Sequence, residues 1–373
     1  MKTKQGVLKA LESAKGKFVS GAVLSLRLSV SRTAVWKAVG DLKKEGYPIL
    51  SVTNKGYMLQ LHSDILSAVA IQEHIRHPAC GARLHVVDSL PSTNQYARAL
   101  ANDGAPDWTV VVANTQTRGC GRRGRVFFSP PDTGVYLSVV LRPDIPYEQS
   151  VLFTVAAAVC VCETIEVLTG LEPRIKWVND ILLDGKKVCG ILTEAVTGFE
   201  DGGVGHLALG VGVNFLPPRS GFPAELCSTA GALFPKAASV SRSQFIGELL
   251  SRLYETFLDI SSPQLIERYR RRSCVVGREV TVTQGGSPLW GRVLDINARG
   301  GLVVETATGR RTVGYGEITS ISHTNLPLNG RKDLRGIIVP DKAEDAGGLT
   351  PGKDDNAVWR NKTRKAFDNL MED

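Results

Sequence analysis

The chain has 373 residues, enough for two or three domains and a sizeable buried core. With 43% hydrophobic and 22% charged residues, it has the composition of a soluble globular protein. Seven cysteines without a CxxC pair and six scattered histidines argue against a disulfide framework, a zinc ribbon or a metal motif. The N-terminus lacks the apolar core of a signal peptide, and no apolar run reaches the ~18 residues of a membrane span, so we expect a cytoplasmic protein.

The net charge of +8 is confined to the first sixty residues. This stretch holds eleven Lys and Arg but only three Asp and Glu, whereas the rest of the chain holds 34 of each kind. A basic segment in an otherwise neutral chain indicates a DNA-binding module.

Residues 1–62 have the pattern of a winged helix-turn-helix domain. Two short helices precede a third, which starts at the N-cap serine Ser31 and stops at Gly46. A two-stranded wing fits residues 49–61, and the third helix is then the recognition helix for the major groove. The predicted DNA contacts are Ser31, Arg32, Thr33, Trp36, Lys37 and Lys43. The alternative is a small docking domain with a solvated basic face; charge, element order and wing together favour DNA binding.

Residues 63–272 are predicted to form an α/β (α+β) domain. After a linker, a strand is expected at residues 84–87, and Ser92 opens a helix. The free N–H groups of that helix terminus suit a carboxylate or a polar head group. On the residues alone, a plain N-cap role for Ser92 is the favoured interpretation. A buried, alanine-rich helix is predicted over residues 151–170.

The most unusual stretch is a loop at residues 115–130, which places three glycines among four arginines. No acidic residue lies between Asp107 and Asp132. Glycines let backbone N–H groups approach a ligand, and guanidinium groups bind phosphate or carboxylate oxygens in pairs. A solvated basic loop or a nucleic-acid patch is the alternative. Apolar runs on both sides of the loop predict strands, so we favour an anion-binding loop held on a sheet.

A hairpin with Asp184-Gly185 at its turn returns Lys187 toward the sheet, beside Lys176 and close to Asp180. A central strand at residues 207–213 ends at Asn214. Helices at residues 242–272 lead to the last domain, at residues 273–323, which shows short strands separated by glycine-containing turns. Residues 324–373 are expected to be a mostly disordered tail.

Three motifs together closely resemble those of the biotin protein ligases. They are Asp88-Ser-Leu-Pro-Ser-Thr-Asn94, the Gly/Arg loop, and the run from Arg174-Ile-Lys-Trp-Val-Asn-Asp180 to Glu194. They occur in the order and at the spacing of that family, over about residues 84–322. The resemblance implies a ligase core with a mixed sheet, followed by a small SH3-like β-barrel. It also implies that biotin is activated with ATP and Mg²⁺ to biotinyl-5'-AMP and passed to a lysine of a biotin carboxyl carrier protein, the acetyl-CoA carboxylase subunit.

The same resemblance implies roles for individual residues. Lys187 would bridge the carboxylate and phosphate oxygens, Arg122 would clamp phosphates, and Asp180 would receive or position the acceptor lysine. The residues implied to bind biotin are Ser92, Thr93, Asn94, Gln116, Cys120, Gly121, Arg122, Lys187 and Gly190. Those implied to bind ATP are Arg122, Arg125, Lys176, Asn179 and Asn214, with Asn179 and Asn214 as weak candidates for orienting Mg²⁺. The Gly/Arg loop should close as a lid, because the mixed anhydride hydrolyses in water.

Three positions depart from the family pattern. Cys120 stands where arginine is usual in the family. This removes one contact to the phosphate or the intermediate and predicts a lid that closes less tightly. Phe127 replaces a common tryptophan, and Val178 replaces the usual proline, at a small cost in rigidity. None of the three removes a catalytic group.

With the basic N-terminal module, the resemblance is to the repressor-type ligases, which implies operator DNA and an adenylate-bound homodimer as partners. Three alternatives remain. The chain could be a DNA-binding regulator that senses the adenylate without ligase activity, although intact Lys187, Asn179 and Asp180 argue against this. It could be a lipoate-type ligase, but the typical Ser-Gly-Gly-Gly segment is missing. It could be a ligase whose N-terminal domain serves only for docking or dimerisation.

Overall fold

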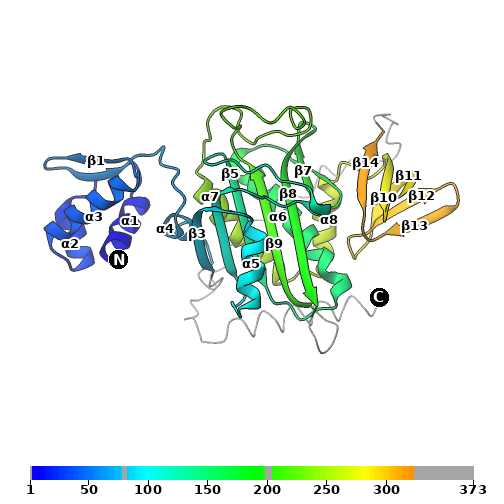
Figure 1. The fold of residues 1–373 in the computed structure, drawn as a ribbon, viewed down its shortest axis with the longest axis horizontal. Helices are drawn as coiled ribbons and strands as arrows, with labels where there is room; N and C mark the ends of the chain where they lie inside the picture. The colour runs from blue at the N-terminus through cyan, green and yellow to red at the C-terminus, as the bar shows by residue number, and fades with distance from the viewer. Residues whose placement is uncertain (1, 78–81, 198–203, 323–373) are drawn as a thin grey trace, which may run out of the picture.

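The computed structural model describes residues 2–77, 82–197 and 204–322, and within them the chain forms three parts in sequence order (Figure 1). A small helical module comes first, a large domain with a central sheet follows, and a five-stranded sheet ends the described chain (Figure 1). The predicted tail at residues 324–373 lies outside the described residues.

The N-terminal module consists of three helices and a two-stranded wing. Its elements are α1 (Lys2–Ser13), α2 (Gly21–Leu28), α3 (Arg32–Lys44), β1 (Ile49–Val52) and β2 (Gly56–Leu59). Ser31 caps α3, its side chain accepting a hydrogen bond of 3.1 Å from the Ala34 backbone N–H. Val35, Val39 and Leu42 are buried at helical spacing, so the opposite, basic face of α3 points to solvent. This order of helices and wing agrees with the predicted winged helix-turn-helix.

The central domain is built on a seven-stranded sheet in the order β3-β4-β5-β9-β8-β7-β6. Strands β3 and β4 are parallel and the other neighbours are antiparallel, so the sheet is mixed as predicted. Its strands are β3 (Arg83–Leu90), β4 (Thr109–Gln116), β5 (Gly134–Leu141), β6 (Arg174–Lys176), β7 (Asp180–Leu183), β8 (Lys186–Thr197) and β9 (Val204–Asn214).

The two faces of this sheet are covered by different helices. Along β4, Val110 and Val112 belong to the main core, whereas Val111 and Ala113 pack in a second, smaller cluster with α5. The main core lies against the longer helices on the other face. The helices are α4 (Ala68–Gln72), α5 (Thr93–Asn102), α6 (Val151–Thr169), α7 (Arg242–Phe257) and α8 (Pro263–Arg272), with short 3₁₀ turns η2 (Arg122–Gly124) and η3 (Tyr147–Ser150).

Helix α4 contributes to two cores at once. Ile71 is fully buried in the main core of the central domain, whereas Val69 packs against the core of the N-terminal module. Ile65, just before α4, also packs against the N-terminal core. This short helix therefore joins the first two parts by apolar contacts on opposite sides.

One helical segment, residues 147–169, corrects an expectation from the sequence. It is long and apolar enough to cross a membrane by length and composition, with a mean hydropathy of 2.1, so the sequence does contain such a run. In the structure 72% of that window is buried inside the protein. Helix α6 is therefore the central core helix of the domain, apolar on all sides because other elements surround it.

The C-terminal part is an antiparallel sheet in the order β13-β12-β11-β10-β14. Its strands are β10 (Glu279–Gln284), β11 (Ser287–Ile296), β12 (Leu302–Thr306), β13 (Gly309–Val313) and β14 (Glu317–Ile321). Among the described residues β13 and β14 are the outer strands, so the structure shows a C-terminal β domain but not the closure of the predicted barrel. The indole N–H of Trp177 donates to the Gly300 carbonyl at 2.9 Å and so ties this domain to the central one.

The core of α6 gives a first prediction. Phe153 is fully buried and its ring centroid lies 5.0 Å from that of Phe257. Phe153→Ala removes this contact and leaves a cavity, so it should lower the free energy of unfolding by about 3–5 kcal/mol in urea denaturation. Val167→Ala on the same helix, at a side chain that is 63% exposed, should change it by less than about 0.5 kcal/mol. Equal losses for both variants would contradict this placement of α6.

Candidate active site

One wall of a pocket on the central sheet is formed by the start of α5. Ser92 is the N-cap of this helix, and its neighbours Thr93 and Asn94 are almost fully buried. The Gln116 side-chain oxygen accepts hydrogen bonds from the Thr93 backbone N–H at 2.8 Å and from its hydroxyl at 3.2 Å. The Gln116 amide in turn donates to the Ser129 hydroxyl at 2.9 Å. These contacts fix a row of neutral polar groups at one end of the pocket.

Asn94 is fixed from both sides. Its Oδ1 accepts a hydrogen bond of 2.6 Å from the Ser138 hydroxyl, and its Nδ2 donates to the Leu192 carbonyl at 3.1 Å. The Glu194 carboxylate, which also pairs with Arg98, accepts a second bond from Nδ2 at 2.9 Å. Because these partners occupy both ends of the amide, its orientation is set by the surrounding strands rather than by a ligand.

The floor of the pocket is made of glycines on β8 and β9. A Cβ atom at Gly210 would lie 2.2 Å from the Asn94 Oδ1, and one at Gly212 would lie 2.7 Å from the Phe127 ring. A Cβ at Gly190 would lie 3.1 Å from the Lys187 side chain. Side chains at these positions would displace the groups that line the pocket.

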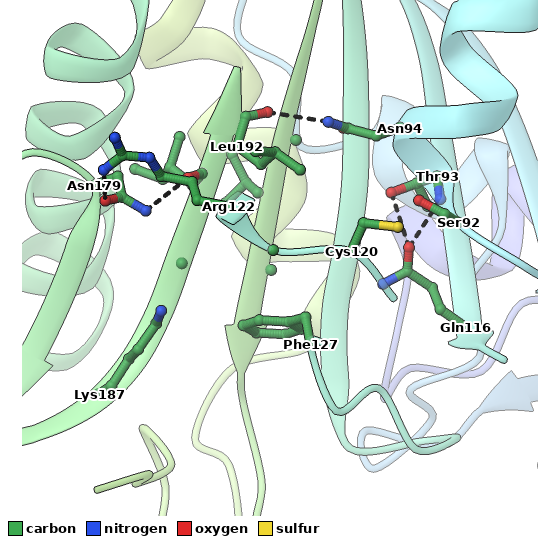
Figure 2. A pocket seen from close by; sticks show the side chains of 16 residues that line it. Ser92, Thr93, Asn94, Gln116, Cys120, Arg122, Phe127, Asn179, Lys187 and Leu192 are labelled. Carbon is green, nitrogen blue, oxygen red and sulfur yellow. Dashed lines mark hydrogen bonds between the residues drawn. The ribbon is translucent and has the colours of Figure 1, made fainter. Parts of the chain in front are cut away.

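The Gly/Arg loop folds back on itself over this floor. The Gly121 N–H donates to the Arg125 carbonyl at 2.7 Å, and the Phe127 N–H donates to the Gly119 carbonyl at 2.8 Å. A Cβ at Gly119 would lie 2.3 Å from the Phe127 carbonyl oxygen, so only glycine allows this close return of the chain. The return places Phe127 between the polar wall and the cationic end (Figure 2).

The opposite end of the pocket is cationic. Arg122 donates to the Asn179 Oδ1 at 3.0 Å, and Asn179 donates to the Ile191 carbonyl at 3.0 Å. The Lys187 ammonium lies 2.6 Å from the Asp180 carboxylate. Burial lowers the pKa of Arg122, and the nearby Asp180 carboxylate opposes that shift. Figure 2 shows Lys187 and Arg122 on one side of Phe127, with Ser92, Thr93 and Gln116 on the other.

The structure gathers most of the predicted site residues in this pocket. All nine residues implied to bind biotin line it, and Asn179 joins them. The pocket also contains six residues that the sequence reasoning missed. These are Phe127, Ile191, Leu192, Gly210, Val211 and Gly212. The alternation Gly210-x-Gly212 in an apolar strand was the available signal, since glycines two apart share one face of a strand.

Four predicted residues do not line the pocket. Asp180 forms an ion pair with Lys187, which itself lines the pocket. Lys176 is on β6, where its Cα pairs with that of Asp180. Asn214 donates to the carbonyls of Lys187 at 3.3 Å and Gly231 at 2.9 Å, so it holds the backbone of the lysine strand.

Arg125, the fourth, is bound elsewhere. Its guanidinium pairs with the Glu317 carboxylate of the C-terminal domain, with one bond of 3.0 Å. Arg123 reaches the same carboxylate at 3.3 Å and the Thr283 carbonyl at 3.1 Å. The C-terminal domain therefore holds two of the four loop arginines.

The predicted DNA contacts lie on one face of the N-terminal module. Arg32 and Trp36 line a groove between α3, the start of α2 and the wing, and Trp36 is 69% exposed. Lys43 donates to the Ser51 hydroxyl of β1 at 2.9 Å. The other three, Ser31, Thr33 and Lys37, are exposed.

The structure joins a helix-turn-helix module to a sheet domain with a pocket that is neutral and polar at one end and cationic at the other. Comparison with known families gives the same division. Residues 3–58 match an HTH domain, residues 86–214 the Biotin/lipoate A/B protein ligase family, and residues 275–319 the Biotin protein ligase C terminal domain.

Relatives narrow the class further. The chain is 34% identical to the bifunctional ligase/repressor BirA of Bacillus subtilis, over 84% of this chain and 98% of that protein. It is 27% identical to BirA of Escherichia coli, over 78% of this chain and 89% of that protein. The biotin protein ligase of Aquifex aeolicus, solved in complex with biotin and ATP, shares the fold with a TM-score of 0.54 and 24% identity, over 65% of this chain and 99% of that one. The chain therefore belongs to the family of bifunctional biotin ligase/repressor proteins.

The cysteines give a test of the site geometry. Burial raises the pKa of Cys160 to about 12 and also raises the pKa of Cys189 on β8, whereas Cys120 lines the pocket and Cys227 is exposed. Alkylation needs the thiolate, so at pH 8 iodoacetamide should label Cys120 and Cys227 in the folded protein. Cys160 and Cys189 should react only after unfolding, which restores an ordinary thiol pKa. Peptide mass spectrometry with and without urea measures this, and labelling of Cys189 before Cys120 would contradict the geometry.

Proposed function

We propose that this protein is a biotin protein ligase and a biotin-operon-type repressor. It activates biotin with ATP to biotinyl-5'-AMP and transfers the biotinyl group to a lysine of a biotin carboxyl carrier protein. With the adenylate bound, it binds operator DNA as a homodimer. The observation that carries the enzymatic half is the division of one pocket into a neutral polar end and a cationic end.

Each end suits one part of the substrate. The Thr93, Asn94 and Gln116 groups are uncharged donors and acceptors, which match the uncharged ureido ring of biotin. Phe127 and the bare glycine floor match the apolar ring and chain. Lys187 and Arg122 match the carboxylate and the α-phosphate that meet at the reacting centre.

The chemistry joins two anions. A biotin carboxylate oxygen attacks the α-phosphorus, the bond from that phosphorus to the bridging oxygen breaks, and pyrophosphate leaves. Lys187 neutralises the negative charge that develops on the α-phosphate oxygens in place of water. In the second step the acceptor lysine, as a neutral amine, attacks the biotinyl carbonyl and AMP leaves. We assign Asp180 the role of orienting that amine or accepting its proton, which requires its carboxylate to release the Lys187 ammonium, its ion-pair partner at 2.6 Å.

Mg²⁺ is expected as the usual partner of ATP phosphates, but the two predicted amides do not fit a protein-held ion. The Asn179 Oδ1 already accepts a hydrogen bond from the Arg122 guanidinium, which repels a cation. The Asn214 amide donates to two backbone carbonyls and lies outside the pocket lining. Among the described residues no cluster of three His, Cys, Asp or Glu could hold a metal ion. We therefore expect Mg²⁺ to enter with the nucleotide phosphates.

The remaining assignments extend this proposal. We place Arg125 and Lys176 near the nucleotide phosphates when the loop closes, with Arg125 then leaving Glu317. We also propose limits at residues 62, 272 and 323 for the domains, an SH3-like arrangement of the last domain, and a cytoplasmic location. A regulator without ligase activity is disfavoured, because Lys187 and Arg122 both line the pocket.

The ligase half is tested at Lys187. Lys187→Ala leaves the charge on the α-phosphate uncompensated, so biotin-dependent pyrophosphate release should fall by about 10²–10³-fold. Lys186→Ala, at the exposed neighbouring lysine, is the matched control and should remain within about threefold of wild type. A Lys187→Ala rate within threefold of wild type would refute the role given to this lysine.

The repressor half is tested on DNA upstream of biotin-synthesis genes. Footprint protection should strengthen with biotin plus ATP, because a ligand that favours the dimer also favours DNA binding by linkage. Protection should weaken steeply with salt, since phosphate contacts release counterions.

Substitutions separate specific DNA contacts from overall charge. Lys37→Ala in α3 should weaken DNA binding at least about tenfold and reduce the salt slope by about one. Lys17→Ala, which removes the same charge at an exposed position before α2, should change binding by less than about threefold. Biotin transfer should be unchanged in both variants. If wild type gives no ligand-dependent protection at any salt concentration, the repressor half is wrong and the ligase half stands.

A further inference from the structure

We infer that Arg242 is a positioning residue that fixes the DNA-binding module on the ligase domain by clamping the linker at Asp64. Arg242 is the first residue of α7, is only 3% exposed, and does not line the pocket described above. A charged side chain is buried this deeply only where partners satisfy it, so the identity of those partners shows what it holds. The inference rests on the proposed function only where it concerns DNA.

The principal partner is the linker. The Arg242 Nε donates to the Asp64 Oδ2 at 2.6 Å, and the Arg242 backbone N–H donates to the Asp64 Oδ1 at 2.7 Å. In a third bond, the Arg242 Nη2 donates to the Asp64 backbone carbonyl at 2.9 Å. Asp64 is thus bound through both carboxylate oxygens and its main chain, shortly after the wing strand β2 ends. Bonds to both carboxylate oxygens restrict direction as well as distance.

The other face of the guanidinium is bound to the central sheet. The Arg242 Nη1 donates to the Asn114 Oδ1 on β4 at 2.8 Å and to the Gly134 carbonyl on β5 at 3.4 Å. The Asn114 amide is itself held by Asp88 at 3.2 Å and Asp132 at 3.0 Å. Arg242 therefore connects the linker to two strands of the sheet through groups whose positions are fixed by other contacts.

Farther along, α7 continues to hold the same segment. A Cβ at Gly247 would lie 2.5 Å from His74, so the linker lies directly against the helix there. The Arg76 backbone N–H donates to the Ser251 hydroxyl at 2.9 Å. With Ile71 buried in the main core between these points, the linker is attached along the length of α7. Of these contacts with α7, the one made by Arg242 is nearest the N-terminal module, and it acts with the apolar contacts of α4 to set the angle at which that module leaves the domain.

This angle matters for a dimer on DNA. Two recognition helices bind half-sites only if their separation matches a whole number of helical turns. A linker held at Asp64 gives each module one orientation before DNA binds, so less ordering is needed on binding. Releasing Asp64 should broaden the accepted half-site spacings and weaken binding to the best one.

The test uses the full chain with Asp64→Asn, which keeps the shape of the side chain but removes its charge, and with Arg242→Gln. Amide hydrogen exchange of residues 61–67 should accelerate at least about tenfold in both variants. On a series of operators with half-site spacing varied by single base pairs, affinity for the best spacing should fall about tenfold and the preference should flatten. Ligase kcat/KM should stay within about threefold of wild type.

Asp295→Asn is the matched control, because it breaks an Asp–Arg pair of 2.7 Å to Arg270 that does not involve the linker. It should leave both the linker exchange and the spacing preference unchanged. Arg242→Gln could lower stability in general, in which case Asp64→Asn decides. Unchanged linker exchange in Asp64→Asn would overturn the inference. If wild type binds no DNA, the repressor proposal fails while the exchange measurement still tests the clamp.

Discussion

The site depends on one constraint, the absence of side chains on a strip of the central sheet. Gly190, Gly210 and Gly212 leave one face of β8 and β9 bare, and a Cβ atom at any of them would lie only 2.2–3.1 Å from a lining group and displace it. The other face of the same strands contributes Cys189, Ile191 and Val211 to the main hydrophobic core, where each is at most 2% exposed. A polar pocket can therefore sit on a stable sheet, because the opposite face supplies the apolar burial that the bare face lacks.

The basic side chains near the pocket fall into two groups. Arg122 and Lys187 line the pocket, where Arg122 binds Asn179 and Lys187 binds Asp180. Arg123 and Arg125 do not line it, and both bind Glu317 of the C-terminal domain. The two arginines on an exposed loop would repel each other, and one carboxylate relieves that repulsion. The C-terminal domain thus fixes two arginines of the Gly/Arg loop, although it contributes no residue to the lining of the pocket.

The sequence predicted the pocket wall well and its floor poorly, for a physical reason. Ser92 and Gln116 were assigned through the resemblance to the biotin protein ligases, since the residues alone favoured a plain N-cap role for Ser92. The spacing of Gly210 and Gly212 indicates a strand face without side chains, but the sequence does not show which side chain faces it, here Asn94. The partner of Arg125 lies 192 positions away, which no local pattern indicates. The bounds of helix α6 were predicted within one residue, but its apolar run was not recognised as long enough to span a membrane.

Helix α4 couples the unfolding of the N-terminal module to that of the central domain. Its two sides belong to different cores, with Ile71 in one and Val69 in the other. Melting either part uncovers apolar surface that the other part was covering, so each stabilises its neighbour without any ligand. The N-terminal module and the central domain are separate in fold yet thermodynamically cooperative, and heating should remove them in one transition rather than two.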